Sequence, residues 1–372
     1  MESGQTMPSS AVELASIPVI DVRDGGPARH AAESRARARA LRDECVGWLP
    51  RLAARSLPAL DSVTCRWLLR SRSHYAAEIS AIASELGFPG IWFLNGCYQW
   101  GCTALACEQA GGPWLVRTLD WPFPGLGRHV EVARMRGPAG EFYNVTWPGY
   151  VGVLTASAPG RFAACVNQAP MWRRTRRPWL RPCDIALNAR RAWGTRAVPP
   201  DHLLREVFET CGTYGEARRR LETTPIARPV IYTLVGCRTG QRCVIERTED
   251  AFDSRDHETR AANDWLRSRA PWEARVGTEV LLTRTSDEAA ENSRARGEYL
   301  AAWSGPFAGD FDWVSPPILN TQTRVAVEMC PAVGVLRAIG YEQCCELALS
   351  EQVTQATVVE TATPDVRETA GF

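Results

Sequence analysis

The chain has 372 residues, of which 45% are hydrophobic and 23% are charged, and its formal net charge is +1. These values are ordinary for a globular protein and allow one large domain or two smaller ones. A nearly neutral chain gives no reason to expect nucleic acid or an anionic membrane as a partner. The sequence also lacks a run of about 18 apolar residues, which would predict a transmembrane helix and stable membrane insertion.

The thirteen cysteines are an odd number and are scattered along the chain. Their spacings, such as Cys237 to Cys243 or the adjacent Cys344 and Cys345, do not match a zinc site. The N-terminal residues show no basic segment followed by an apolar one, as a secretory signal would. We therefore expect reduced thiols in a cytoplasmic protein that uses neither a metal nor a cofactor.

The first part of the chain is predicted to be helical. A poorly fixed tail ends in the apolar segment 17–20, and apolar residues then recur at helical spacing over 29–56 and 60–86. The run Gly-Phe-Pro-Gly at 87–90 ends the second helical stretch. From residue 91 the pattern becomes typical of strands.

A β-hairpin is predicted over residues 100–121. Two runs of strand-forming residues flank the turn Gly111-Gly112-Pro113. Pairing of these runs would bring Arg117 and Asp120 beside Cys102, so that a guanidinium, a carboxylate and a thiol share one strand end.

This grouping has a chemical use. A cysteine is a weak nucleophile until a base or a cation lowers the pKa of its thiol. If the bond between Gly101 and Cys102 were cut, the new α-amine, whose reference pKa is about 8, would lie near its own sulfur and accept the thiol proton. Arg117 would favour the thiolate and Asp120 would orient the amine. The alternative is a purely structural role, in which Cys102 is a buried strand residue and Arg117 and Asp120 form an ion pair at the surface.

The remaining pattern runs from strands to helices and back to strands. Strand pairs are predicted over 130–135 with 142–147, 150–155 with 161–167, 229–236 with 242–248 and 324–329 with 335–341, and a single strand over 279–283. Helices are predicted over 183–194, 201–211, 214–222 and 287–303, with Asp201 and Thr213 as N-caps. This order fits an α+β fold, an αββα sandwich of two antiparallel sheets covered by helices.

Several blocks resemble one family. Gly101-Cys102-Thr103, followed by Arg117-x-x-Asp120-Trp121, is similar to the processing site of the acid ceramidase and N-acylethanolamine acid amidase group of N-terminal-nucleophile (Ntn) hydrolases, which are related to choloylglycine hydrolases and penicillin acylases. Further blocks follow in the family's order: residues 148–155, 159–160, 166–167, 229–232 and 243–247. The resemblance covers roughly residues 88–340 and implies a helical pro-region over 1–101 and a catalytic domain over 102–372.

The resemblance also assigns further site residues. Asn167 falls where the family places a polar pocket residue, and its amide is a candidate oxyanion donor. Gln168 stands where acid ceramidase has Glu. Arg284, in Thr283-Arg284-Thr285, stands where the family has Asn, and is either an oxyanion helper or turned outward. The family's second arginine near the nucleophile is carried over to Arg294, although Arg296 is close and only one of the two can point at the site.

The resemblance implies a self-processing enzyme that hydrolyses linear, non-peptide amide bonds of N-acyl amides, such as N-acylethanolamines or ceramide-like lipids. It also implies that one precursor yields two chains. Two alternatives remain: an acyltransferase that uses the same acyl-enzyme, and a catalytically degenerate binding protein on the same fold. A papain-type Cys–His pair is not favoured, because the five histidines share no motif, and no Gly-x-Ser-x-Gly elbow occurs.

Overall fold

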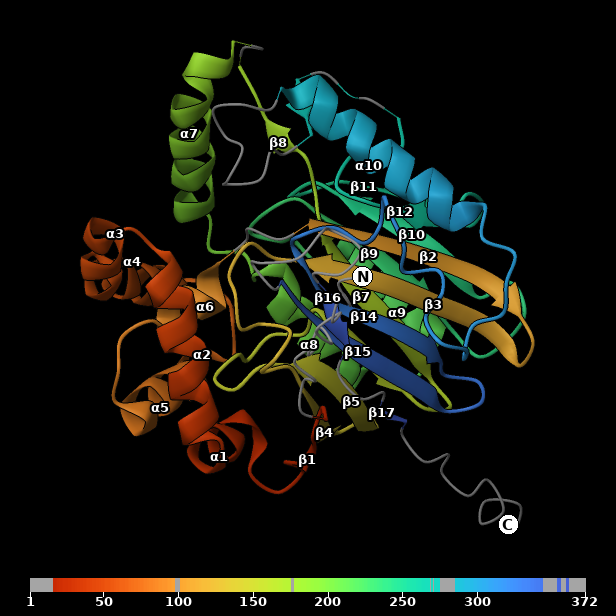
Figure 1. Ribbon diagram of the computed structural model, residues 1–372, viewed down its shortest axis with the longest axis horizontal. Coiled ribbons are helices and arrows are strands. Elements are labelled where there is room, and N and C mark those ends of the chain that lie inside the picture. Colours follow the sequence, from red (N-terminus) through yellow and green to blue (C-terminus); the bar gives the residue numbers. More distant parts are fainter. Residues whose placement is uncertain are drawn as a thin grey trace, which may run out of the picture.

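Two β-sheets packed face to face form the centre of the protein (Figure 1). The computed structural model describes residues 16–97, 101–174, 177–267, 269, 271–274, 285–343, 353–355 and 359–360. In spatial order, the first sheet consists of β1 (Val19–Asp21), β4 (Glu131–Gly137), β5 (Gly140–Thr146), β6 (Thr155–Ala158), β7 (Phe162–Gln168), β9 (Val230–Val235), β10 (Arg242–Arg247) and β11 (Phe252–Arg255). All its strand pairings are antiparallel except that of β1 with β4.

The second sheet carries the predicted hairpin. In spatial order it consists of β12 (Arg260–Ala261), β2 (Gly101–Gln109), β3 (Gly112–Asp120), β14 (Thr323–Cys330), β15 (Val335–Gln343) and β16 (Val353–Gln355), with β17 (Val359–Glu360) also paired to β15. The turn between β2 and β3 places Gly111 at φ +89° and Gly112 at φ +125°, which only glycine adopts readily. The register pairs Gly101 with Asp120 and Ala104 with Arg117, so the hairpin prediction is confirmed.

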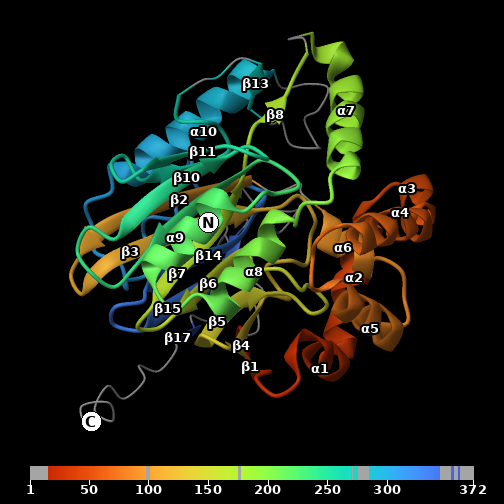
Figure 2. The same ribbon diagram turned by 180° about the vertical axis from the view of Figure 1, so that it is seen from behind.

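Helices cover the outer face of each sheet, which completes the predicted αββα sandwich. From behind, α8 (Pro200–Thr210) and α9 (Tyr214–Thr223) lie over the first sheet (Figure 2). On the opposite side, α10 (Ser286–Ala301) packs on β2 and β12. The helix α7 (Arg181–Gly194) follows the short 3-10 helix η1 (Pro178–Leu180) and stands beyond the sheets, near a two-stranded ribbon of β8 (Met171–Trp172) and β13 (Trp272–Glu273).

The core between the two sheets is filled by apolar side chains from both of them. Buried residues from each sheet belong to one contiguous cluster, including Ala104, Leu115 and Leu119 from the second sheet and Val132, Val145 and Cys165 from the first. Such a layer is the expected result of alternating strand residues whose inner faces meet away from water. Any polar side chain placed in this layer must find its partners inside the protein.

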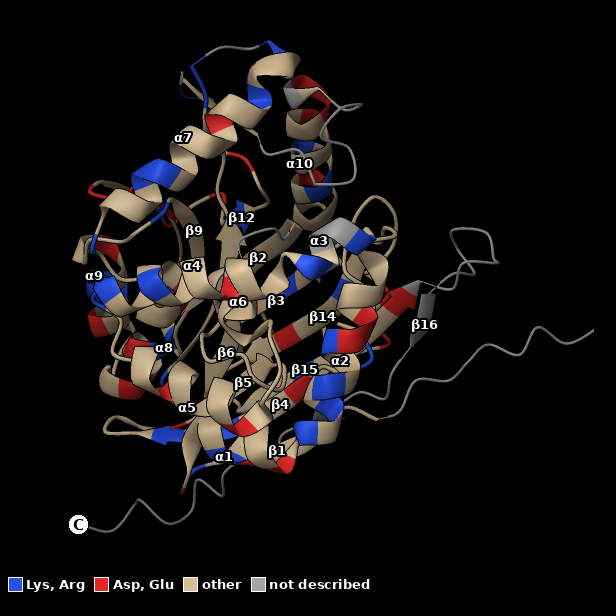
Figure 3. Cartoon of the chain, turned by 90° about the vertical axis from the view of Figure 1, so that its left-hand side faces the viewer, with Lys and Arg blue, Asp and Glu red and all other residues tan. Residues whose placement is uncertain are grey.

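The N-terminal region is helical, as predicted, but its segmentation differs. It contains α1 (Gly26–Glu33), α2 (Arg35–Trp48), α3 (Arg51–Arg55), α4 (Leu57–Arg70), α5 (Ala76–Leu86) and α6 (Ile91–Gly96). Figure 3 faces this group of helices, along which basic and acidic residues both occur. In the described part of the chain no helix is long and apolar enough to cross a bilayer.

The apolar run that begins at residue 91 is a helix, which corrects the strand-like interpretation. The carboxylate of Asp61 in α4 accepts hydrogen bonds from the backbone N–H groups of Gly90, at 2.6 Å, and Phe93, at 2.8 Å. A carboxylate at a helix N-terminus satisfies unpaired N–H groups and opposes the helix dipole. This partner lies about thirty residues earlier in the chain, so the local pattern could not reveal it.

The structure also differs from the predicted elements at several single positions. Thr213 caps α9 through a capping box with Glu216, as predicted. Asp201 does not cap α8, because Pro199 occupies the N-cap position; Asp201 lies in the first turn and accepts a hydrogen bond from the Tyr150 hydroxyl. The strand predicted from residue 150 begins only at Thr155. The strand predicted over 279–283 lies outside the described residues.

The N-terminal helices are fastened to the loop after β5 and to α7 by buried polar contacts. The side-chain amide of Asn95 in α6 donates to the carbonyl of Gly149, and its oxygen accepts from the backbone N–H of Val151. The Trp67 indole of α4 donates to the carbonyl of Ala192 at 2.9 Å. The helical region therefore shares its interior with the loops that leave the first sheet.

Replacing Asn95 with Ala should destabilise the protein, because it leaves buried backbone groups at Gly149 and Val151 without partners. We expect the free energy of unfolding to fall by about 3 kcal/mol. Urea unfolding followed by tryptophan fluorescence measures this change. Ser62→Ala, at an exposed position of α4, is the control and should change the value by less than about 0.5 kcal/mol. Equal stability of the two variants would contradict this account.

Candidate active site

Cys102 lies at the start of β2 with its side chain fully buried between the two sheets. Its sulfur accepts a hydrogen bond from Nη2 of Arg117 at 2.9 Å. Its backbone N–H donates to the side-chain oxygen of Asn263 at 2.8 Å. The sulfur and the nitrogen of one residue are thus each held by a separate polar group.

Arg117 is also fully buried, and its guanidinium spans the space between the sheets. Besides the sulfur, Nη2 donates to the carbonyl of Val166 at 3.1 Å, and Nη1 donates to the Thr155 hydroxyl at 2.6 Å. The sequence placed Arg117 beside Cys102, and the hairpin register brings these two residues together. Arg117 is an interior residue, which excludes the alternative of a surface ion pair.

The buried surroundings of the Cys102 thiol strongly oppose its ionisation. Burial raises the pKa of Cys102 to about 12, against the opposing effect of the Arg117 cation. The charge of Asp120 raises this pKa further, while the backbone N–H of Gln168 lowers it by hydrogen bonding to the sulfur. At neutral pH the sulfur therefore carries its proton and must lose it before it can react.

Asp120 ends β3 directly opposite Gly101. Its Oδ1 accepts a hydrogen bond from the Thr323 hydroxyl at 3.0 Å, and its Oδ2 lies 3.4 Å from Nη1 of Arg296. A Cβ atom built on Gly101 would lie 3.2 Å from the Cβ of Asp120, a contact that only a small shift could relieve. The carboxylate therefore lies close to the Gly101–Cys102 bond, where the sequence had placed it.

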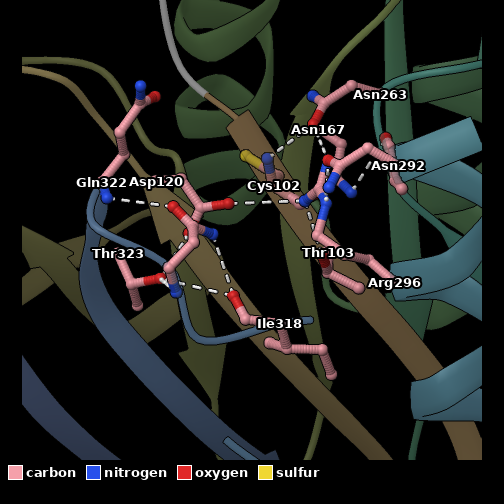
Figure 4. A network of polar contacts seen from close by, with 12 residues as sticks. Cys102, Thr103, Asp120, Asn167, Asn263, Asn292, Arg296, Ile318, Gln322 and Thr323 are labelled. Atoms are coloured by element: carbon pink, nitrogen blue, oxygen red, sulfur yellow. Dashed lines mark hydrogen bonds and ion pairs between the residues drawn. The ribbon is translucent and has the colours of Figure 1, made fainter. Parts of the chain in front are cut away.

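Arg296 of α10, which the sequence interpretation named only as the neighbour of Arg294, belongs to this cluster. Its Nη1 donates to the carbonyl of Cys102 at 2.8 Å and to the Thr103 hydroxyl at 2.7 Å. Its Nη2 donates to the side-chain oxygen of Asn263 at 3.0 Å (Figure 4). One buried cation thus holds the backbone of Cys102, the side chain of Thr103 and the side chain of Asn263.

Arg294, which the resemblance suggested, does not reach this cluster because its side chain is exposed. Two residues along a helix differ by roughly 200° in direction, so Arg294 and Arg296 face opposite ways. A signal was present in the sequence: Ala289, Ser293, Arg296 and Leu300 recur at helical spacing and form the buried face of α10. The structure corrects the assignment from Arg294 to Arg296.

Asn263 is a residue that the sequence did not single out. It lies in the loop after β12, without a motif around it, and its Nδ2 donates to the carbonyl of Gln168 at 3.0 Å. Asn167, the expected oxyanion donor, is fully buried and uses its Nδ2 for the carbonyls of Ala261 and Ala262, both at 3.3 Å. Asn167 thereby fixes the segment that carries Asn263, and its amide points into the protein.

The remaining candidates are placed as follows. Gln168 is buried at the end of β7. Its carbonyl accepts a hydrogen bond from the side chain of Asn263, and its backbone N–H donates one to the Cys102 sulfur. Arg284 and the residues 98–100, just before the expected cleavage point, lie outside the described residues. Among the described residues no group of three or more His, Cys, Asp or Glu side chains could hold a metal ion.

An apolar cavity lies between the N-terminal helices and the segment that follows β3. It has a volume of about 80 Å³ and a lining that is almost entirely apolar. Trp121, which directly follows Asp120, forms part of its wall; α2 and α6 supply much of the rest, including Leu41, Cys45, Val46, Phe93 and Leu94. The helices before Cys102 therefore meet the segment that directly follows Asp120 at this cavity.

Comparisons with known proteins agree with the motifs. No family model matches the chain. An N-acylethanolamine-hydrolyzing acid amidase from Oryctolagus cuniculus is 26% identical over 183 residues, which are 47% of this chain and 48% of that protein. The chain thus matches about half the length of this curated relative. The resemblance to the N-acylethanolamine acid amidase group is confirmed by this similarity.

Two solved structures are also similar. A Caenorhabditis elegans ortholog of N-acylethanolamine-hydrolyzing acid amidase has 16% identity and a TM-score of 0.46, over 62% of this chain and 93% of that chain. A mutant of the conjugated bile acid hydrolase from Clostridium perfringens has 10% identity and a TM-score of 0.36, over 71% of this chain and 97% of that chain.

The two arginines of α10 form a matched pair for testing this geometry. Arg296→Met removes a buried cation beside the Asp120 carboxylate and should lower the free energy of unfolding by about 3 kcal/mol. Arg294→Met alters only an exposed side chain and should change that free energy by less than about 0.5 kcal/mol. Thermal and urea unfolding of both variants would show the difference. If Arg294→Met were the more damaging change, the placement of α10 described here would be wrong.

Proposed function

We propose that this protein is an Ntn amide hydrolase that cuts its own chain before Cys102 and then cleaves linear amide bonds. The observation that carries the proposal is the hydrogen bond from Arg117 to the Cys102 sulfur, made inside the core beside the Asp120 carboxylate. A cation kept in the interior against a thiol is costly unless it serves to stabilise a thiolate. The similarity to an N-acylethanolamine-hydrolyzing acid amidase supports the same reading.

In the uncut chain the first reaction is self-cleavage. The sulfur of Cys102 attacks the carbonyl carbon of Gly101, the peptide C–N bond breaks, and the nitrogen of Cys102 takes up the thiol proton. Water then hydrolyses the resulting thioester and leaves a free α-amine on Cys102. Asn263 and Arg296 hold the nitrogen and carbonyl of Cys102 on either side, which fixes the reacting bond in one geometry.

After cleavage the α-amine is the base for substrate hydrolysis. With a reference pKa of about 8, it can accept the thiol proton near neutral pH. The amide nitrogen of Cys102 in the uncut chain is not basic enough to accept that proton. The thiolate attacks the amide carbonyl, and the amine product leaves with the proton. Water then releases the acyl group. Arg117 stabilises the thiolate, and Asp120 orients the α-amine.

The oxyanion donors we assign are the backbone N–H of Gln168 and the side-chain amide of Asn263. The N–H of Gln168 already points at the sulfur, so it lies near the atom that the nucleophile attacks. One hydrogen of the Asn263 amide binds the carbonyl of Gln168, and the other has no partner among the described residues. Donors fixed in advance in this way stabilise developing charge without rearranging. Arg284 stays a candidate helper.

The substrate class we propose is an N-acyl amide with an apolar acyl chain, such as an N-acylethanolamine or a ceramide-like lipid. The apolar cavity beside Trp121 supports this class, because its lining offers almost no polar atoms to a ligand. Residues 1–101 would then remain bound as a small chain after cleavage, since they supply α2 and α6 to the cavity wall. The free thiols of the described cysteines support a cytoplasmic location.

Two alternatives keep part of this scheme. An acyltransferase would pass the same acyl group to an amine in place of water, and its product would reveal it. A binding protein without activity is favoured by one observation, the fully buried and protonated thiol of the uncut chain. A single band of uncut protein after purification would support that alternative.

Cys102→Ala should abolish both self-cleavage and amide hydrolysis, because one sulfur starts both reactions. Gel electrophoresis shows the cleavage, and N-terminal peptide mass spectrometry should find Cys102 as the first residue of the large fragment. Hydrolysis of a panel of N-acyl amides, followed by mass spectrometry, measures the activity. Cys183→Ala changes an exposed cysteine and should keep both reactions. Two fragments and turnover from Cys102→Ala would rule out the proposal.

Asp120→Asn keeps the shape of the side chain and removes its charge. We expect normal folding but a fall in kcat of about a hundredfold, because the α-amine loses the group that orients it. Circular dichroism checks the fold, and steady-state kinetics on the best substrate of the panel checks the rate. Unchanged kinetics would make Asp120 a purely structural residue.

A further inference from the structure

Arg117 has few ways to hold its orientation in the core. It stands on β3 of the second sheet and reaches towards the first sheet, where it finds the hydroxyl of Thr155 and the carbonyl of Val166. Its Nε has no hydrogen-bond partner among the described residues. The direction of the guanidinium is therefore set by its two terminal nitrogens, because a guanidinium is planar and its donors are fixed relative to one another.

The Thr155 hydroxyl is the shortest contact of that guanidinium. Its oxygen lies 2.6 Å from Nη1, compared with 2.9 Å for the sulfur and 3.1 Å for the Val166 carbonyl at Nη2. Thr155 is only 1% exposed, so no solvent competes for this hydroxyl. Each of the two terminal nitrogens thus has its own anchor in the first sheet, and the nitrogen that meets the sulfur is the one shared with Val166.

The backbone of Thr155 is itself immobilised. It is the first residue of β6 and pairs with Cys165 of β7, next to Val166. The neighbouring N–H of Val166 donates to the carbonyl of Leu154 at 2.9 Å, which closes this end of the ladder. A threonine side chain in a strand has restricted rotation about its first torsion angle, so the hydroxyl is a fixed point.

We infer that Thr155 is a positioning residue, whose hydroxyl holds Nη1 of Arg117 so that Nη2 faces the Cys102 sulfur. Removing the hydroxyl leaves a second buried N–H group of Arg117 unsatisfied and frees the guanidinium to turn away. The sulfur then loses its charge-assisted hydrogen bond, and the thiolate becomes harder to form. This inference rests on the proposed function, because it assigns Thr155 to the activation of that nucleophile.

Thr155→Val is the direct test, since valine has the shape of threonine without the hydroxyl. We expect kcat for the N-acyl amide to fall about tenfold, because the Cys102 thiolate becomes harder to form. KM should stay within about twofold of wild type, because the residues that bind the substrate are unchanged. The rate of Cys102 alkylation by iodoacetamide should also fall about tenfold at pH 8, and its pH profile should shift to higher pH. Peptide mass spectrometry reads this rate, with the exposed Cys183 of the same protein as internal reference.

Two matched variants separate the hydroxyl from packing. Thr155→Ser keeps the hydroxyl and should stay within about twofold of wild type in kcat and in alkylation rate. Thr146→Val, on β5, removes a buried threonine hydroxyl that has no partner among the described residues, and it should behave like wild type. If Thr155→Val does not fold by circular dichroism, Thr155→Ala replaces it, with the same expected losses.

The inference is overturned if Thr155→Val alkylates Cys102 with the wild-type pH profile, or if Thr155→Ser loses as much as Thr155→Val. In the second case the methyl group, and thus packing, would account for the loss. The alkylation rates decide the role of Thr155 even if wild type hydrolyses no amide, and that outcome would refute the proposed function alone.

Discussion

A guanidinium enclosed between two sheets is the interaction on which this site depends. Arg117 has no exposed surface, and its hydrogen bonds go to a hydroxyl, a backbone carbonyl and the Cys102 sulfur. An interior cation surrounded by neutral acceptors is unfavourable, and a nearby thiolate is the partner that would relieve it. Burial acts against that ionisation and holds the thiol neutral in the uncut chain. The site is therefore balanced between two opposing electrostatic effects.

A second cation completes the arrangement from the opposite side of β2. Arg296 contacts the Cys102 backbone, Asp120 and Asn263, and so gathers β2, β3, the loop after β12 and helix α10 around one residue. Its own polar neighbours include the Asp120 carboxylate, which balances its charge. Cys102 is thus held at its backbone by one arginine and at its sulfur by another. In the proposed scheme, these separate contacts keep the backbone fixed while the sulfur changes its protonation state.

The N-terminal helices belong to the same packed interior as the two sheets. They are fastened by the Asn95 amide and the Trp67 indole, and they form one wall of the apolar cavity beside Trp121. Residues on both sides of the proposed cleavage point therefore build one interior. In the proposed scheme, cutting the chain before Cys102 changes the chemistry of one nitrogen and leaves this shared interior in place.

The sequence by itself determined the hairpin, and with it the meeting of Cys102 with Arg117 and Asp120, because a Gly-Gly turn fixes the register of the strands it joins. It also determined the order of strands and helices in the sandwich, because alternation of apolar residues is a local property. Only the tertiary structure decided that residues 91–96 are helical, that Arg296 and not Arg294 contacts the site, and that Asn263 reaches the backbone of Cys102. Each of these three features depends on a partner far away in the chain, which no local pattern encodes. Packing against that partner selects the local conformation and decides which face of a helix points inward.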